Sequence, residues 1–191
     1  MMANNSKYFA WVITIAAAFG GYALWKRGRS SNPPSLINNP EFDMSTNPNL
    51  PRGYRNNNPL NIRYSAYNNW KGKILPNTDR NNTFEQFVNI VYGYRAALAL
   101  MRTYIRKYGC NTIEKIIAKW APENENNTTA YIEHVCQILN LEPDTIVTQS
   151  SRDTLTKMAY AMSIIENGNT PETREAGLPD MNIINEAWDI L

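Results

Sequence analysis

Apolar residues recur at three- and four-residue steps through the second half of the chain, a spacing typical of amphipathic helices that bury one face. The first such stretch predicts a helix over about 92–108 that ends at Gly109. Four more helices are predicted: one capped by Asn111 or Thr112 and ended by Pro122, one capped by Asn127, one capped by Ser150 or Ser151 and ended at 166–168, and one from about Asp180. Strand patterns are few, and a small hairpin is predicted only at 60–75. The pattern therefore indicates a mainly α domain.

The first 27 residues differ from the rest of the chain. Residues 8–25 carry no charge, and Thr14 is their one clearly polar side chain. At ~1.5 Å per residue, a helix of this length spans the hydrocarbon core of a membrane. Aromatic residues mark both ends of the stretch: Tyr8, Trp11, Tyr22 and Trp25. We predict a single transmembrane helix, with a cleaved signal peptide as the alternative because 21–23 is a small-x-small site.

Residues 28–51 hold five prolines and show no apolar periodicity, which predicts an extended tether. The chain therefore divides into an anchor at 1–27, a tether at 28–51 and a helical domain at 52–191. Lys26, Arg27 and Arg29 outnumber Lys7, so the positive-inside rule places the domain on the cytoplasmic side of the membrane.

Composition and charge limit the classes of function that the chain could have. The net charge of +2 creates no large basic field, so a nucleic-acid partner is not expected. Cys110 and Cys136 have no metal-binding or disulfide spacing, and His134 is the only histidine, so no zinc site or other cofactor is expected. His134 and Cys136 lie two residues apart, where helical side chains face different directions, which argues against a cysteine peptidase. If the protein is an enzyme, its catalytic groups are therefore carboxylates or amides.

The most unusual polar segment is 55–63, in which three asparagines precede Pro59. Asparagine competes for backbone hydrogen bonds and proline removes a donor, so a shaped loop is expected. Amides beside aromatic faces are what a glycan-binding cleft requires, and the alternative is a surface loop of an Asn-rich protein. The predicted substrate-binding residues are Asn56, Asn57, Asn58, Asn61, Trp70 and Tyr131.

Glycosidic cleavage needs a carboxylic acid that an apolar setting keeps protonated. Glu166 is the best candidate, because an apolar helix delivers it to a turn at Gly168. The alternative is a solvated glutamate at a helix end. Glu41, Glu85 and Glu125 are the other candidate acids.

Several spaced segments resemble a family of phage and prophage structural proteins whose domains are relatives of lysozyme-like lytic transglycosylases. The matching segments are 52–62, 70–72, 93–96, 112–113, 120–122, 125–128, 131–132 and 165–168. The resemblance covers roughly residues 52–168. It implies a lysozyme-like helical fold, peptidoglycan as substrate, Glu166 as acid and base, and Tyr131 at the cleft.

In lytic transglycosylases the helix that ends in the catalytic Glu precedes the loop and the Tyr helix, whereas here Glu166 follows both. The resemblance then implies either a circularly permuted domain or an inert one that has lost its acid. The corresponding functions are a membrane-anchored virion enzyme that cleaves between N-acetylmuramic acid and N-acetylglucosamine, and a structural virion protein that binds glycan or coat subunits. A host enzyme of wall remodelling is a third interpretation.

The expected partners are peptidoglycan, a lipid membrane at residues 8–25, and capsid or other virion proteins. The expected location is a single-pass protein of a virion internal membrane or a host inner membrane. The cytoplasmic orientation conflicts with a wall substrate outside the cell, and a viral membrane that is wrapped by a capsid inside the host would resolve this conflict.

Overall fold

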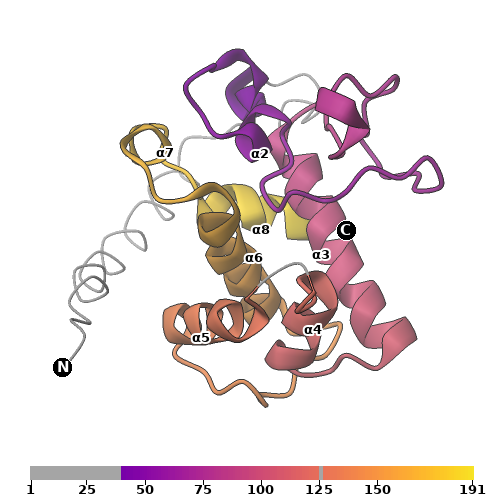
Figure 1. Ribbon diagram of the computed structural model, residues 1–191, viewed down its shortest axis with the longest axis vertical. Coiled ribbons are helices and arrows are strands. Elements are labelled where there is room, and N and C mark those ends of the chain that lie inside the picture. The colour runs from indigo at the N-terminus through magenta and orange to yellow at the C-terminus, as the bar shows by residue number, and fades with distance from the viewer. Residues whose placement is uncertain (1–39, 125–126) are drawn as a thin grey trace. The chain divides into compact units, whose positions relative to one another are not determined.

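The computed structural model describes residues 40–124 and 127–191, all of which fall in one of the two compact units of the chain, Ser35–Leu191. Its α-helices are α2 (Arg52–Arg55), α3 (Ile90–Tyr108), α4 (Ile113–Trp120), α5 (Thr128–Leu139), α6 (Arg152–Asn167), α7 (Pro171–Glu175) and α8 (Met181–Asp189) (Figure 1). Short 3-10 helices occur at η2 (Pro40–Phe42), η3 (Met44–Thr46) and η4 (Arg80–Asn82). The predicted mainly α class is confirmed.

The five predicted helices are α3, α4, α5, α6 and α8. Their caps follow the local sequence, because the side chains of Thr112, Asn127 and Asp180 each accept a backbone N–H of the first turn. Gly109 ends α3 in the left-handed conformation. The start of α3 lies two residues before the predicted one, since the Asn89 side chain caps it.

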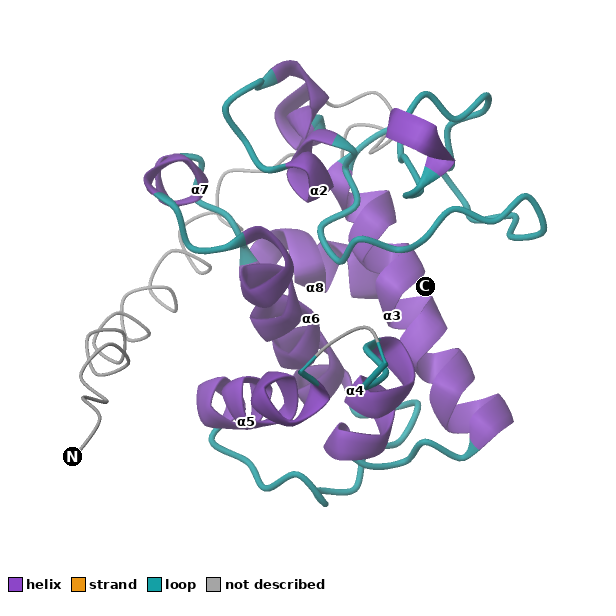
Figure 2. Cartoon of the chain, viewed as in Figure 1, coloured by secondary structure: helices purple, strands orange, loops and turns teal. Residues whose placement is uncertain are grey.

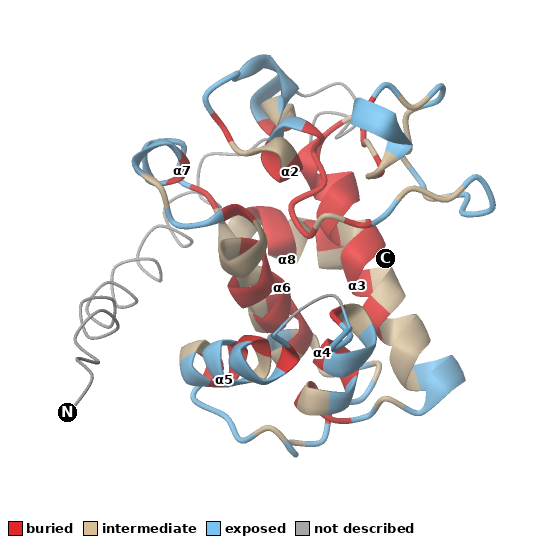
Figure 3. Cartoon of the chain, viewed as in Figure 1, coloured by how far each residue is buried: buried red, intermediate tan, exposed pale blue. Residues whose placement is uncertain are grey.

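The hydrophobic core lies between α3, α5, α6 and α8. Helix α6 contacts α5, α8, α3 and α2, and α3 also packs along α8. Figure 3 shows buried positions along α3, α6 and α8. The largest fully buried side chains include Tyr94, Leu98, Leu155 and Met158. The sequence pattern places Leu155, Met158, Ala159, Met162 and Ile165 on the inner face of α6. The first four are buried, and Ile165 is partly buried against the core.

The predicted hairpin at 60–75 is wrong. Figure 2 shows no strand in the described part of the chain, where pairing is limited to isolated bridges such as Arg63 with Phe84 and Lys73 with Phe87. The backbone near 63 and the backbone near 73 both pair with 83–88, through Tyr64 N–H to Thr83 O and Ile74 N–H to Gln86 O. The two predicted hairpin strands are joined to each other by the Lys73 side chain, which donates to the Ser65 carbonyl at 2.7 Å.

Part of the expected tether packs against the helical unit. Phe42 and Leu50 are buried in the core, and the Asp43 carboxylate accepts a hydrogen bond from Asn57 at 2.8 Å. The packed chain thus begins before Arg52. The predicted membrane span at 8–25 lies outside the described residues, and no helix within those residues is long and apolar enough to cross a membrane.

The segment Asn56–Asn61 is a rigid loop between α2 and the bridging segments. Asn57 and Asn61 have φ values of 51° and 49°, a left-handed conformation that asparagine tolerates better than most residues. Gly93 of α3 packs directly on this loop, because a Cβ at that position would collide with the Asn57 carbonyl oxygen. The absence of a side chain at Gly93 lets the loop lie against α3.

We expect Gly93→Ala to destabilise the protein by about 1–3 kcal/mol, because the added methyl group displaces the loop. Alanine is the better helix former by about 1 kcal/mol, so helix propensity alone predicts the opposite sign. Urea unfolding followed by circular dichroism measures the free energy of unfolding. A variant as stable as the wild type would contradict the close packing of the loop on α3.

Candidate functional site

The side chain of Glu166 lies half-buried in the last turn of α6, one residue before the end of the helix. The Asn61 amide donates to Glu166 Oε2 at 3.0 Å, and the Tyr131 hydroxyl donates to Oε1 at 3.1 Å. The loop, α5 and α6 therefore each contribute one of these three side chains. The structure brings Glu166 beside the segment Asn56–Asn61, as the sequence predicted.

Burial raises the pKa of the Glu166 carboxyl, because the charged form loses hydration. Hydrogen bonds from Asn61, Tyr131 and Trp120 and the charge of Arg63 act in the opposite direction, but burial outweighs them. Burial also raises the pKa of Tyr131, and the neighbouring Glu166 adds to that shift. Burial therefore shifts the pKa of Glu166 upward, which is the direction that a general acid requires.

Asn167, the residue after Glu166, ties the helix end to the loop. Its buried amide donates to the Pro59 carbonyl at 2.7 Å and to the Ser163 carbonyl at 3.0 Å. Gly53 of α2 faces this junction, since a Cβ there would collide with the amide oxygen of Asn167 and lie 2.7 Å from that of Asn61. These contacts fix the position of Glu166 relative to Asn61.

The other three predicted loop amides are buried. Asn56, Asn57 and Asn58 are 7%, 1% and 0% exposed. Asn58 donates to the carbonyls of Ile62 and Glu85 and accepts the Ile62 N–H, and the Asn57 amide oxygen accepts the Met44 N–H. Asn57 and Asn58 thus satisfy buried backbone groups that have no helix or strand partner, whereas Asn56 bonds to the side chains of Asp79 and Gln86. The role predicted for these three residues in substrate binding stays a prediction, and Asn61 is the loop amide that reaches Glu166.

Trp70 is partly buried against the hydrophobic core. Its indole N–H is enclosed without a hydrogen-bond acceptor among the described residues. Trp70 therefore contributes to the packing of the core, and its predicted role in substrate binding stays a prediction.

The alternative acids have other environments. Glu85 is fully buried and forms an ion pair with Lys73 at 3.0 Å, while it also accepts the Ser65 N–H. The ion pair with Lys73 therefore occupies the Glu85 carboxylate. Glu41 is exposed in η2, and Glu125 lies outside the described residues.

Sequence reasoning missed three contributors to the site: Trp120, Arg63 and Asn167. Trp120 was assigned to the apolar face of its helix, and Asn167 to a turn. Asn167 follows the candidate acid directly, and this adjacency was the available signal. Within residues 40–124 and 127–191, no group of His, Cys, Asp and Glu could hold a metal ion.

Comparison with known proteins gives one informative match. No family model matches the chain. Protein P5 of Pseudoalteromonas phage PM2 is 40% identical over 124 residues, which cover 64% of this chain and 74% of P5.

Replacement of Glu166 by glutamine is expected to change how stability depends on pH. Since the folded-state pKa of Glu166 lies above its unfolded value, its stabilising contribution is full below the unfolded value and is lost as pH rises through the folded value. Glutamine resembles the protonated acid at every pH. The unfolding free energy of Glu166→Gln minus that of the wild type should therefore increase with pH.

Glu172→Gln is the matched control, because hydrogen bonds from its own backbone N–H and from Thr170 lower the pKa of the exposed Glu172. The unfolding free energy of Glu172→Gln minus that of the wild type should therefore decrease as pH rises. Urea titrations between acidic and neutral pH measure both differences. A pH-independent difference for Glu166→Gln would show that burial does not perturb this carboxyl.

Proposed function

Since the chain belongs to the family of protein P5 from Pseudoalteromonas phage PM2, we propose that it is a virion-associated phage enzyme that cleaves the glycan strands of peptidoglycan. The cleaved bond joins N-acetylmuramic acid to N-acetylglucosamine. The observation that carries this proposal is the half-buried Glu166 carboxyl with a raised pKa, held by Asn61 and Tyr131 at the end of an apolar helix.

The chemistry uses this one carboxyl group in two steps. Protonated Glu166 donates its proton to the glycosidic oxygen as the bond from that oxygen to the anomeric carbon breaks. The Glu166 carboxylate then accepts the proton of the muramyl 6-hydroxyl as that oxygen bonds to the same anomeric carbon. The products are a free 4-hydroxyl group and a 1,6-anhydro end.

A second carboxylate is needed by most hydrolysing glycosidases, as base or nucleophile. Glu85, the buried candidate for that role, is already paired with Lys73. Because this ion pair occupies Glu85, the site favours a lytic transglycosylase over a hydrolase. Tyr131 and Asn61 would orient the acid through their hydrogen bonds.

Aromatic side chains extend from Glu166 along α4 and α3. Trp120 forms a hydrogen bond to Glu166, and its ring lies 6.3 Å from that of Tyr104 at 67°. Tyr104 in turn lies 6.2 Å from the exposed Tyr108. Rings of this kind offer apolar faces to sugars, so they support a glycan polymer as the ligand.

The second candidate is a structural virion protein whose domain does not cleave its ligand. Both carboxylate oxygens of Glu166 already accept hydrogen bonds from the protein, which is what an inert, purely structural side chain would show. Partners would then be other virion proteins. The lysozyme-like fold, the permuted order of elements and the membrane anchor at 8–25 remain parts of the proposal.

Glu166→Gln should abolish clearing of purified peptidoglycan in a zymogram while the circular dichroism spectrum stays unchanged. We expect at least about a hundredfold loss of activity, because general acid catalysis contributes that much. Glu133→Gln, an exposed position on α5, is the matched control and should retain full activity.

Mass spectrometry of the digested peptidoglycan identifies the reaction. Anhydromuramyl ends support the transglycosylase, and reducing ends indicate a hydrolase. Absence of products from the wild-type protein would favour the structural alternative, and full activity of Glu166→Gln would remove this residue from the mechanism.

A further inference from the structure

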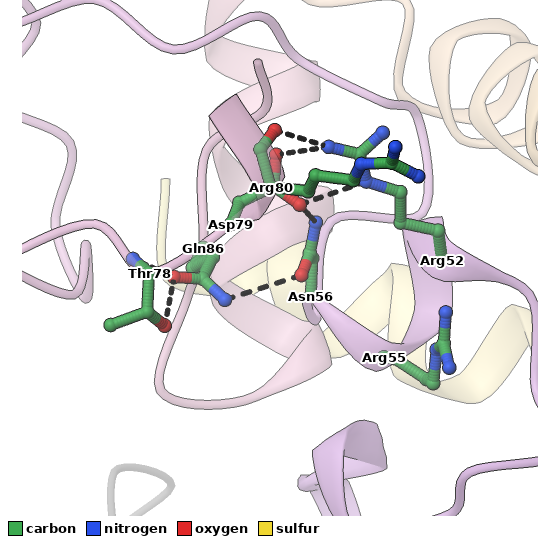
Figure 4. A pocket seen from close by; sticks show the side chains of 7 residues that line it. All are labelled: Arg52, Arg55, Asn56, Thr78, Asp79, Arg80 and Gln86. Atoms are coloured by element: carbon green, nitrogen blue, oxygen red, sulfur yellow. Dashed lines mark hydrogen bonds and ion pairs between the residues drawn. The ribbon is translucent and has the colours of Figure 1, made fainter. Parts of the chain in front are cut away.

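A second site lies beside α2, where a pocket of about 330 Å³ opens between this helix and the segment 78–86. Figure 4 shows the side chains that line it. Arginines dominate this lining, in which Arg52, Arg55 and Arg80 surround Asp79, Asn56 and Gln86. Neither Glu166 nor Tyr131 belongs to it, so the pocket is distinct from the candidate active site.

The buried Asp79 neutralises only one of the three arginines. Arg52 donates to both carboxylate oxygens of Asp79, at 2.8 and 2.7 Å. Asn56 and the Phe84 N–H add bonds of 2.8 and 2.9 Å. Burial alone would raise the pKa of Asp79, but these bonds outweigh it and lower the pKa. The Asp79 carboxylate thus accepts hydrogen bonds from Arg52, Asn56 and Phe84, and it holds the first two side chains in place at the pocket.

The other two guanidinium groups remain available. Arg55 and Arg80 are exposed, and among the described residues neither forms an ion pair. Arg55 reaches only the Pro48 carbonyl, at 3.5 Å. Figure 4 shows Arg55 without a bond to another lining residue. Two uncompensated positive charges therefore border a hollow lined by charged and amide side chains.

This lining selects an anion rather than a sugar ring. No aromatic face opens into the pocket, and Arg52 already covers the ring of Phe84 at 4.8 Å. Guanidinium groups recognise carboxylates through paired, charge-assisted hydrogen bonds. The chemical class of the ligand is therefore an anionic group, a carboxylate or a phosphate.

The pocket is connected to Glu166 by the Asn loop. Asn56 donates into the pocket, and Asn61 donates to Glu166. Asn61 is the fifth residue after Asn56, so their Cα atoms lie at most ~18 Å apart. Because the intervening Asn57 and Asn58 are buried and hydrogen-bonded, this spacing is fixed, and one polymer can contact both places.

We propose that the pocket at Arg55 and Arg80 binds a carboxylate of the peptide stems that branch from the glycan strand of peptidoglycan. This inference rests on the proposed function and adds to it the part of the substrate that the enzyme selects. The glycan occupies the Glu166 site, and a peptide stem on the same strand places its carboxylate between the two free arginines.

The test is co-sedimentation of the full chain with intact sacculi and with sacculi whose peptide stems have been removed by an amidase. All proteins carry Glu166→Gln so that the polymer is not degraded. The chain with native arginines should bind intact sacculi about tenfold more tightly than stripped ones, and salt should weaken that preference. Adding Arg55→Gln and Arg80→Gln should remove the preference.

Arg106→Gln with Lys115→Gln is the matched control, because both positions are exposed and the same charge is lost. This control should keep the preference for intact sacculi. Equal binding to intact and stripped sacculi by the chain with native arginines, or an unchanged preference in the Arg55 and Arg80 variant, would overturn the pocket assignment.

Product release by the protein with native Glu166, measured on the same sacculi, reports separately on the proposed function. Product release without a preference for intact over stripped sacculi would support the enzyme proposal and contradict the pocket assignment. Peptide-dependent binding without product release would support the pocket and contradict catalysis.

Discussion

The hydrogen bond from the Asn167 amide to the Pro59 carbonyl holds the two halves of the candidate site together. It joins the end of α6 to a loop more than a hundred residues earlier in the chain. Asn61 then reaches Glu166 from the same loop, and Gly53 leaves room for both amides. The burial that raises the pKa of Glu166 depends on this closure, since an open loop would expose the carboxyl to water.

The loop keeps its conformation because the amides of Asn56, Asn57 and Asn58 are hydrogen-bonded to neighbouring segments. Asn57 and Asn58 replace the backbone pairing that a strand would supply, and each unpaired buried group would cost about 1–3 kcal/mol. Asparagine is suited to this role, because it bonds backbone donors and acceptors and tolerates the left-handed conformation found at Asn57 and Asn61. The amide-rich sequence thus serves structure first, and one amide remains for the site.

Local features of the sequence predicted the helices, because caps such as Thr112 and Asn127 and the inward faces of α3 and α6 depend on nearby residues. Proximity of Glu166 to the loop was also predicted. The roles of Asn56, Asn57, Asn58 and Trp70 were not, since burial depends on contacts with Phe87, Met44 and the core that are distant in sequence. Composition likewise gave no sign of the pocket, because a net charge of +2 hides a local cluster of arginines.

The enzyme proposal and the scaffold alternative share the same geometry, and the enzyme proposal also requires that burial raise the pKa of Glu166. A carbon-detected NMR titration of the Glu166 side-chain carboxyl, assigned by comparison with Glu166→Gln, measures that state directly. Our account predicts a midpoint above the ordinary value for glutamate, and a further rise in Tyr131→Phe, which lacks the hydroxyl donor. A midpoint at or below the ordinary value would contradict it.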